Sequence, residues 1–220
     1  MLLYEDRVVG AMADAIRLRT YAFLDNIQPQ YAAMTGTVVK GDPCLSGMAQ
    51  LYIELEPGSG IYSLLDAAVK VSNAKPGFLI VEREYGEIEL HSFSVDDVHE
   101  AGRAILGACK LTVQDRQKPV IVSEQIITRV DPYQAQLVNR SRHGSLLLPD
   151  ENLLIMEVEP AAYISIAVNE AEKAADIKII TFDPVGKFGR MYVSSNRVAE
   201  VQMALEAANT ALKAIDGVGR

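Results

Sequence analysis

The chain has 220 residues, which is enough for two domains of about 100 residues, each with its own hydrophobic core. Its formal net charge of -8 argues against binding to nucleic acid or to an anionic membrane, because both require a basic protein surface. The two cysteines, Cys44 and Cys109, lie far apart, which excludes a disulfide-stapled scaffold and indicates a reducing compartment. No stretch approaches the roughly 18 uninterrupted apolar residues of a membrane span.

The sequence repeats itself. Residues 20–110 align with residues 123–213 at a constant offset of 103, without a gap and with twenty identities. The identities fall on turn residues, such as Pro29 with Pro132, and on one periodic apolar face. The same fold is therefore written twice, and we expect two similar domains.

Each copy opens with a segment rich in β-forming residues, at 21–24 in the first copy and at 125–127 in the second. Prolines follow directly, within 25–29 in the first copy and at 131–132 in the second. The pattern predicts a strand that is closed by a proline turn.

After a polar loop, the two copies share five further elements. The sequence predicts an alternating strand that ends at proline, an amphipathic helix, two strands joined by a glycine-bearing turn, and a final helix. In the first copy these elements cover 51–57, 61–69, 77–81, 87–91 and 94–105, and in the second they cover 153–160, 164–174, 177–182, 190–194 and 196–208.

This order of elements predicts an α/β fold, an α+β sandwich in which helices cover one antiparallel sheet in each copy. The first domain is expected at 18–112 and the second at 120–216, joined by a charged linker at 113–119. Residues 1–17 have no counterpart in the second copy, so we expect them to form a mobile N-terminal extension.

Catalysis needs a nucleophile, a base and an orienting group, or a metal cluster, and the sequence shows no such pattern. His91, His99 and His143 lie far apart without a carboxylate or cysteine at ligand spacing, so we interpret them as surface or core histidines. No phosphate loop or cofactor fingerprint is present. We therefore expect no enzyme activity, no catalytic residue, no cofactor and no metal.

Two pairs of carboxylates stand in the alternating strands. They are Glu54 with Glu56 in the first copy, and Glu157 with Glu159 in the second. Because they alternate with apolar residues, we expect both pairs on the solvent face of their sheets.

The copies diverge most in the turn between the paired strands, although the flanking sequences agree. The first copy has Glu82, Arg83 and Glu84 in this turn, and the second has residues 184–187, while an aromatic residue followed by glycine is kept in both. Three adjacent charges usually mark a solvated turn, and the pattern alone favours that interpretation over a functional one.

Three segments of the second copy, at 160–163, 169–175 and 189–192, resemble segments of tandem-domain bacterial microcompartment shell proteins of the trimer-forming kind. Within this family the chain is most similar to carboxysome minor shell proteins of the stacked, gated type. That similarity is carried by residues 18–30, Val81-Glu82-Arg83 and residues 134–140. The resemblance covers about residues 18–216.

The resemblance implies two tandem, circularly permuted microcompartment domains in each chain, and three chains that close into a pseudohexameric tile. It implies that Glu82 and Arg83 line a gated central pore, and it places Gly186 and Lys187 in the corresponding turn of the second domain.

The resemblance also implies that Lys70 and Lys173 lie at the edge of the tile, where each helix packs antiparallel against its neighbour. The implied partners are further copies of the chain, as a homotrimer or as two stacked trimers, together with neighbouring hexameric shell proteins. Small anionic metabolites are implied in the pore, and neither nucleic acid nor membrane is expected.

The implied location is a microcompartment shell in the bacterial cytoplasm, with the carboxysome, and hence carbon fixation, as the nearest match. An alternative remains open: a trimeric regulatory protein that binds or senses a small molecule between its subunits. Flat tiles would indicate the shell protein, and dispersed trimers would indicate the regulatory protein.

Overall fold

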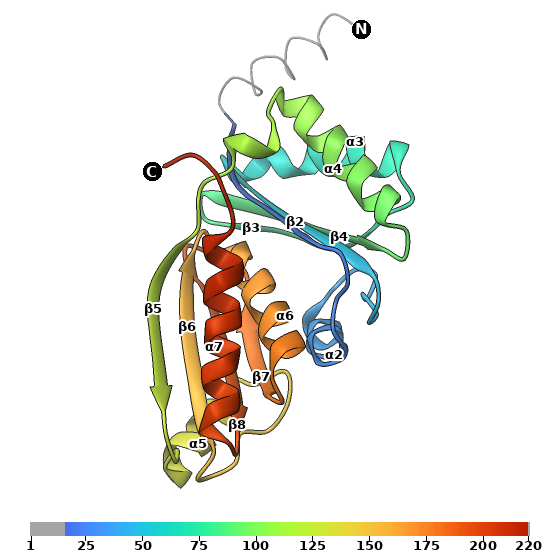
Figure 1. Cartoon of the computed structure of the whole chain (residues 1–220). Helices are drawn as coiled ribbons and strands as arrows, with labels where there is room; N and C mark the ends of the chain where they lie inside the picture. Colours follow the sequence, from blue (N-terminus) through green and yellow to red (C-terminus); the bar gives the residue numbers. More distant parts are fainter. Residues whose placement is uncertain (1–15, 220) are drawn as a thin grey trace, which may run out of the picture.

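The computed structural model describes residues 16–219 (Figure 1). Residues 1–15 of the extension expected at 1–17 therefore lie outside the described residues. The first repeat comprises β1 (Arg17–Leu24), α2 (Pro29–Val38), β2 (Ala49–Glu56), η1 (Gly58–Gly60), α3 (Ile61–Val71), β3 (Lys75–Glu82), β4 (Tyr85–Ser92) and α4 (Val95–Cys109). After a short turn, η2 (Val113–Asp115), the second repeat comprises β5 (Val120–Ile127), α5 (Pro132–Asn139), β6 (Asn152–Glu159), η3 (Ala161–Tyr163), α6 (Ile164–Ala174), β7 (Lys178–Asp183), β8 (Gly189–Ser195) and α7 (Val198–Lys213). Every element of the first repeat has a counterpart that starts within one residue of the offset of 103, which confirms the repeat.

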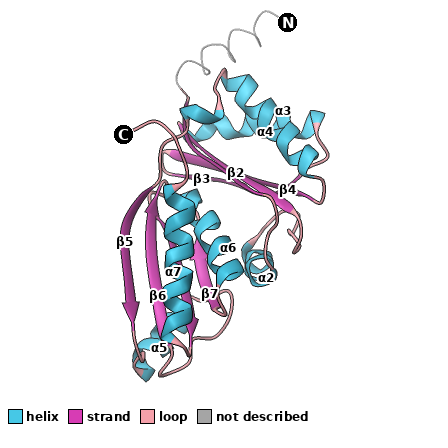
Figure 2. Cartoon of the chain, viewed as in Figure 1, coloured by secondary structure: helices cyan, strands magenta, loops and turns pink. Residues whose placement is uncertain are grey.

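Each repeat forms a four-stranded antiparallel sheet, with the strand order β1-β2-β4-β3 in the first and β5-β6-β8-β7 in the second. Helices α3 and α4 cover one face of the first sheet, and α6 and α7 cover the corresponding face of the second (Figures 1 and 2). This arrangement confirms the predicted sandwich of helices on an antiparallel sheet. Within the described residues, no helix combines the length and the apolar character that crossing a membrane requires.

One helix in each repeat was not predicted. Pro29 and Pro132 do not close turns, but occupy the first turn of α2 and α5. Proline suits this position because its fixed φ is already helical and its missing N–H would have had no partner there. In the second repeat the carboxylate of Asp131 caps the helix by accepting a hydrogen bond from the N–H of Tyr133 at 2.8 Å.

The first sheet is buried on both faces. Its upper face packs against α3 and α4 in one hydrophobic cluster, which includes Leu51 and Ile53 of β2. Its lower face contributes Tyr52 to a second cluster, together with Tyr31 and Met34 of α2 and with the core of the second repeat. This second cluster is continuous between the two repeats, and α2 lies between them (Figure 1).

The glycine that both copies keep after the turn is required by a close approach of two chain segments. A Cβ atom on Gly86 would lie 2.2 Å from the backbone oxygen of Gly58, and one on Gly189 would lie 2.0 Å from that of Ala161. Any side chain at these positions would therefore push η1 away from β4, or η3 away from β8.

Candidate functional site

The turn of the first repeat is exposed and charged. Arg83 adopts a left-handed backbone conformation, with a φ of 56°, and this places its side chain in solvent with 91% of its surface exposed. Its Nε atom is 3.6 Å from Oε1 of Glu82, whose side chain is half exposed. An ion pair this exposed contributes little to stability, so both side chains are free to change partners.

The turn of the second repeat lies beside the first. Gly186 has a φ of 99°, and a Cβ atom built on it would lie 3.8 Å from Cγ of Glu82. The next residue, Lys187, has its Nζ atom 5.1 Å from the centre of the Phe188 ring. The structure thus brings the turns of the two repeats together within one chain; their place relative to a three-fold axis stays a prediction.

A buried ion pair supports the first turn from below. Nε of Arg19 is 2.6 Å from Oε1 of Glu54, and both side chains are at least 95% buried. The guanidinium of Arg19 also stacks on Tyr85, the first residue of β4, at 3.6 Å from the ring centre. Glu54 accepts further hydrogen bonds from Thr20 Oγ1 and from the backbone N–H of Ala162, so the pair links the first turn to the second repeat.

The expectation that both carboxylate pairs face solvent is wrong for Glu54 and Glu159, which are 1% and 5% exposed. Alternation shows which residues share a sheet face, but at Glu54 that face is covered by the second repeat. Burial raises the pKa of Glu54, although the charge of Arg19 opposes this rise. The side chain of its counterpart Glu157 is 22% exposed, and there the hydrogen bond from Arg190 lowers the pKa.

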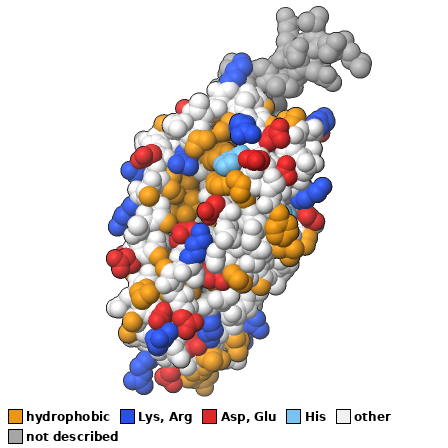
Figure 3. Space-filling model, turned by 45° about the vertical axis from the view of Figure 1, so that its right-hand side comes forward, with side chains coloured by type: hydrophobic (Ala, Val, Ile, Leu, Met, Phe, Trp, Pro, Cys, Tyr) orange, Lys and Arg blue, Asp and Glu red, His pale blue; other side chains and the backbone are white. Residues whose placement is uncertain are grey.

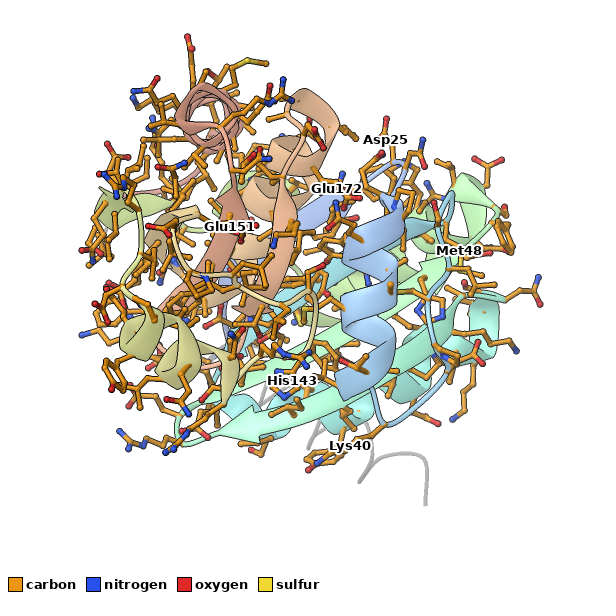
Figure 4. All side chains as sticks on the ribbon, turned by 90° about the horizontal axis from the view of Figure 1, so that it is seen from below. Asp25, Lys40, Met48, His143, Glu151 and Glu172 are labelled. Carbon is orange, nitrogen blue, oxygen red and sulfur yellow. The ribbon has the colours of Figure 1, made fainter. Side chains whose placement is uncertain are left out.

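The repeats meet at a seam, which we define as the contact of η3, α6 and β7 with β1 and α2. The carboxylate of Glu172 accepts hydrogen bonds from the N–H groups of Gln30 and Tyr31, at 2.8 and 2.9 Å. These N–H groups belong to the first turn of α2 and have no partner inside the helix, so the carboxylate stabilises the helix end. Asn169 bonds to Gln28 N and to the carbonyl oxygen of Asn26, and Figure 4 shows α6 and α2 side by side.

Equivalent positions differ in burial where the seam covers only one of them. Asn169 is fully buried in the seam, whereas the side chain of its counterpart Asp66 is 60% exposed. Met34 on α2 is 2% exposed, whereas its counterpart Leu137 on α5 is 61% exposed. The α3 face and the β5–α5 face are thus built like the two sides of a seam, but no described part of the chain covers them.

Large apolar side chains stand on these uncovered faces. Figure 3 shows hydrophobic side chains in groups among charges of both signs on the side of the molecule that it presents. Exposed apolar groups of this kind mark interaction surfaces. On α3, β5 and α5 they are Tyr62, Val69, Val71, Val120, Val122, Tyr133 and Leu137.

The two lysines predicted at the tile edge occupy equivalent places near the ends of α3 and α6. Lys70 is 68% exposed and pairs with Asp66 one turn earlier. Lys173 is 31% exposed and pairs with Glu170 at 2.7 Å and with Asp25 of the first repeat at 3.5 Å. Both lie on the surface, and no contact in the single chain tests the edge role.

The histidines and cysteines do not converge on a reactive centre. His91 is buried with its Nδ1 atom 2.9 Å from Oε1 of Glu89, whereas His143 is exposed. Burial raises the pKa of the Cys44 thiol to about 12 and that of Cys109 to about 11, so neither forms a thiolate near neutral pH. Among the described residues, no group of three histidine, cysteine or acidic side chains is placed to hold a metal ion.

A cavity of about 980 Å³ opens between the repeats, below the first sheet. Its walls combine aromatic rings with cationic groups from both repeats. Lys40 and His143 lie near the same end of α2, where the hydroxyl of Thr37 bonds to the carbonyl oxygen of His143 (Figure 4). Arg190 and Tyr192 of β8 complete the wall on the side of the second repeat.

Comparison with known proteins agrees with this geometry. Residues 18–115 match the family model of the CsoS1D N-terminal domain. The chain is 45% identical over 202 residues to the carboxysome shell protein CcmP of Synechococcus elongatus, which covers 92% of this chain and 94% of that protein. It is 43% identical over 199 residues to the carboxysome shell protein CsoS1D of Hydrogenovibrio crunogenus, which covers 90% of this chain and 97% of that protein.

Two solved structures share the fold over more than nine-tenths of the chain. One is a fused permuted hexameric shell protein from the RMM microcompartment, with a TM-score of 0.88, 39% identity, and coverage of 92% of this chain and 99% of that one. The other is a double-ringed trimeric shell protein from the same kind of microcompartment, with a TM-score of 0.88, 33% identity, and coverage of 93% and 100%. These matches confirm the permuted tandem-domain fold.

The equivalent glutamates Glu54 and Glu157 give a matched test of burial. Arg19→Met should lower the free energy of unfolding by about 3 to 5 kcal/mol, because it leaves a buried carboxylate without its partner. Arg190→Met, which removes the partner of the more solvated Glu157, should cost only about 0 to 1 kcal/mol. Urea unfolding of the two variants measures both values, and equal losses would contradict a special role for the buried pair.

Proposed function

The chain belongs to the family of carboxysome shell proteins that includes CcmP and CsoS1D, and we propose that three copies close into a pseudohexameric shell tile with a gated central pore. In this role the protein is a structural and transport component of the shell, not an enzyme. Polar or phosphorylated metabolites of small size and negative charge pass through the pore.

The difference in burial between equivalent positions supports this proposal most directly. One seam is made within each chain, where α6 contacts β1 and α2. The uncovered α3 face is equivalent to the α6 face at the offset of 103, so the β5–α5 face of the next copy would cover it. Such a contact is head to tail, so it closes into a ring when the rotation fits. Two repeats per chain and six positions in the ring require three chains.

The offset of 103 predicts the contacts between chains. Asp66 takes the place of Asn169, and Asp131 takes the place of Gln28, so the carboxylate of Asp66 should accept a hydrogen bond from the N–H of Asp131 in the next copy. The two seams are not identical. Val69 replaces Glu172, which agrees with α5 being capped by its own Asp131.

The paired turns support the proposed gate. In a trimer, three copies of Arg83 meet near the axis, and like charges about 4 Å apart repel by roughly 4 kcal/mol per pair at an effective dielectric of about 20. Glu82, which is already paired with Arg83, offsets this repulsion in a closed ring of alternating charges. In an open state both side chains turn toward water, and Gly186 and Lys187 complete the rim.

The helix lysines support assembly of tiles with one another and with hexameric shell proteins. Lys70 and Lys173 stand at equivalent places, so a closed ring would present one lysine on each of its six sides. Two rings can also stack, and the double-ringed trimeric shell protein from the RMM microcompartment is a relative with two rings.

The cavity between the repeats favours a second candidate, a trimeric protein that binds a small molecule as a regulator. Both functions require the same trimer, so they differ in whether trimers assemble further into sheets. Electron microscopy of the purified protein separates them: extended flat sheets indicate the shell protein, and dispersed trimers indicate the regulator.

We expect Asp66→Arg to abolish the trimer, because it places a bulky cation where the seam needs a small hydrogen-bond acceptor. The control is Asp66→Asn, which installs the residue that the seam within the chain already uses, and it should leave the trimer intact. Light scattering should give about three times the 24.0 kDa of one chain for the control and one chain mass for the arginine variant. Unchanged circular dichroism shows that both fold, and a trimeric arginine variant would count against this interface.

Lys173→Ala should leave the trimer intact and prevent sheet formation, because an exposed lysine contributes little to the fold but an edge contact is repeated around every tile. Lys70→Ala should act more weakly, since Val71-Ser72-Asn73 follows it in place of the small alanines of the second copy. Electron microscopy of sheets measures the effect. If the double variant tiles normally, the lysines have no edge role.

Glu82→Ala should shift the pore toward its open state, because the three arginines then lack compensating charge. Glu84→Ala removes an exposed carboxylate from the same turn and is the control. Trimer mass should not change in either variant. A cryo-EM map of the Glu82 variant that shows the same closed pore as the wild type would overturn the gate assignment.

A further inference from the structure

Glu87 is a buried acidic residue directly behind the first turn. It belongs to β4, two residues after Tyr85, and is 2% exposed. Both of its carboxylate oxygens are inaccessible, and neither has a hydrogen-bond partner among the described residues. A charged carboxylate in such a place is strongly unfavourable, so burial favours the neutral, protonated form of the group.

The charges around Glu87 are mostly negative. Glu54 lies directly opposite on β2, Glu89 lies on the same face of β4, and Asp183 approaches from β7 of the second repeat. The cation on β1 is Arg19, and its Nε is already bound to Glu54. Burial, followed by these three carboxylates, raises the pKa of Glu87 well above the ordinary value for glutamate.

On the second repeat, Arg190 of β8 stands opposite Asp183, and its guanidinium is bound to Glu157. The charged groups on β1, β2, β7 and β8 therefore leave Glu87 without a dedicated cation within the described part of the chain.

Glu87 and Asp183 stand at the bases of the two turns. Asp183 is the last residue of β7 and immediately precedes the second turn, whereas Glu87 follows the first turn on β4. The tips of the same turns also lie side by side, as the contact between Gly186 and Glu82 shows. A change in charge at Glu87 therefore acts where the two turns are held together.

This pair of acidic residues belongs to only one kind of seam. At the offset of 103, Arg190 stands in the place of Glu87, and Ile80 stands in the place of Asp183. The contact between chains would thus bring an arginine next to an isoleucine. The charge of the arginine does not change near neutral pH. Three of the six seams in a ring would respond to protons, and the other three would not.

We propose that Glu87 is a proton-operated switch that sets how closely the two turns pack, and thereby biases the gate. With its proton bound, the neutral carboxyl group allows the packing seen in the structure. When the proton leaves to water, the new negative charge repels Asp183 and Glu54, and the turns separate. The switch rests on the proposed gate for its function, but all of its groups lie in one chain.

The sign of the effect follows from the direction of the pKa shift. Because the folded chain holds the proton more tightly than the unfolded chain, the stabilisation is complete below the ordinary value of 4.5 and is lost as pH rises toward the raised pKa. Rising pH should therefore loosen the turns. Falling pH should favour the packed arrangement.

The test uses a single fluorescent reporter, which is possible because the chain has no tryptophan. Phe188→Trp places the reporter on the second turn, at a site that is 36% exposed. Its emission is followed from about pH 5 to about pH 9, the range in which buried glutamates titrate. The reporter is placed in the wild-type background, with Glu87→Gln, and with the exposed-site control Glu84→Gln.

We expect a shift of the emission maximum to longer wavelength with rising pH in the wild-type background and with Glu84→Gln. Glu87→Gln should abolish this shift and should also flatten the fall of Tm over the same pH range. A shift that persists in Glu87→Gln, or a wild-type background without any shift, would overturn the switch.

The oligomeric state is measured on the same samples by light scattering. A monomer that shows the Glu87-dependent shift would refute the shell tile but keep the switch. A trimer without that shift would keep the tile and refute the switch.

Discussion

Each repeat folds with a helix face and a sheet edge that only another repeat can cover, and this constraint shapes the whole molecule. The seam within the chain meets it once: Glu172 satisfies the first turn of α2, and Asn169 bonds to the loop before it. The same surfaces on α3 and on β5–α5 are not covered by residues 16–219 of a single chain. Closure into a ring would cover them with surfaces that already exist, so a trimer needs no additional binding element.

The two repeats have the same backbone fold, but they carry different charged residues at equivalent positions. The first repeat buries Arg19, Glu54 and Glu87 behind its turn, where the second has Val122, Glu157 and Arg190. In the second set Glu157 and Arg190 form a partly exposed ion pair, whereas the first set is short of positive charge and is covered by the neighbouring repeat. Duplication of the domain therefore allows two kinds of seam, because alternate seams of the proposed ring differ in charge.

The repeat, the succession of strands along the chain and the helices α3, α4, α6 and α7 were predictable, because they depend on turn residues and on local periodicity. Helices α2 and α5 were missed because a proline that opens a helix looks the same in sequence as one that closes a strand. The burial of Glu54 was missed for another reason: alternation defines a face, but only the fold shows that a second repeat covers it. Arg19 and Glu87 could have been singled out from the sequence, since both differ in charge from their counterparts at the offset of 103.

The most direct test of ring closure is a cryo-EM structure of the assembled wild-type protein at side-chain resolution. We expect a three-fold ring in which α3 of each chain packs on β5 and α5 of the next, with Asp66 bonded to the N–H of Asp131 across the contact. We also expect all six turns to meet at the axis. A ring in which α3 faces solvent, or in which Glu82 and Arg83 lie far from the axis, would contradict the proposed tile.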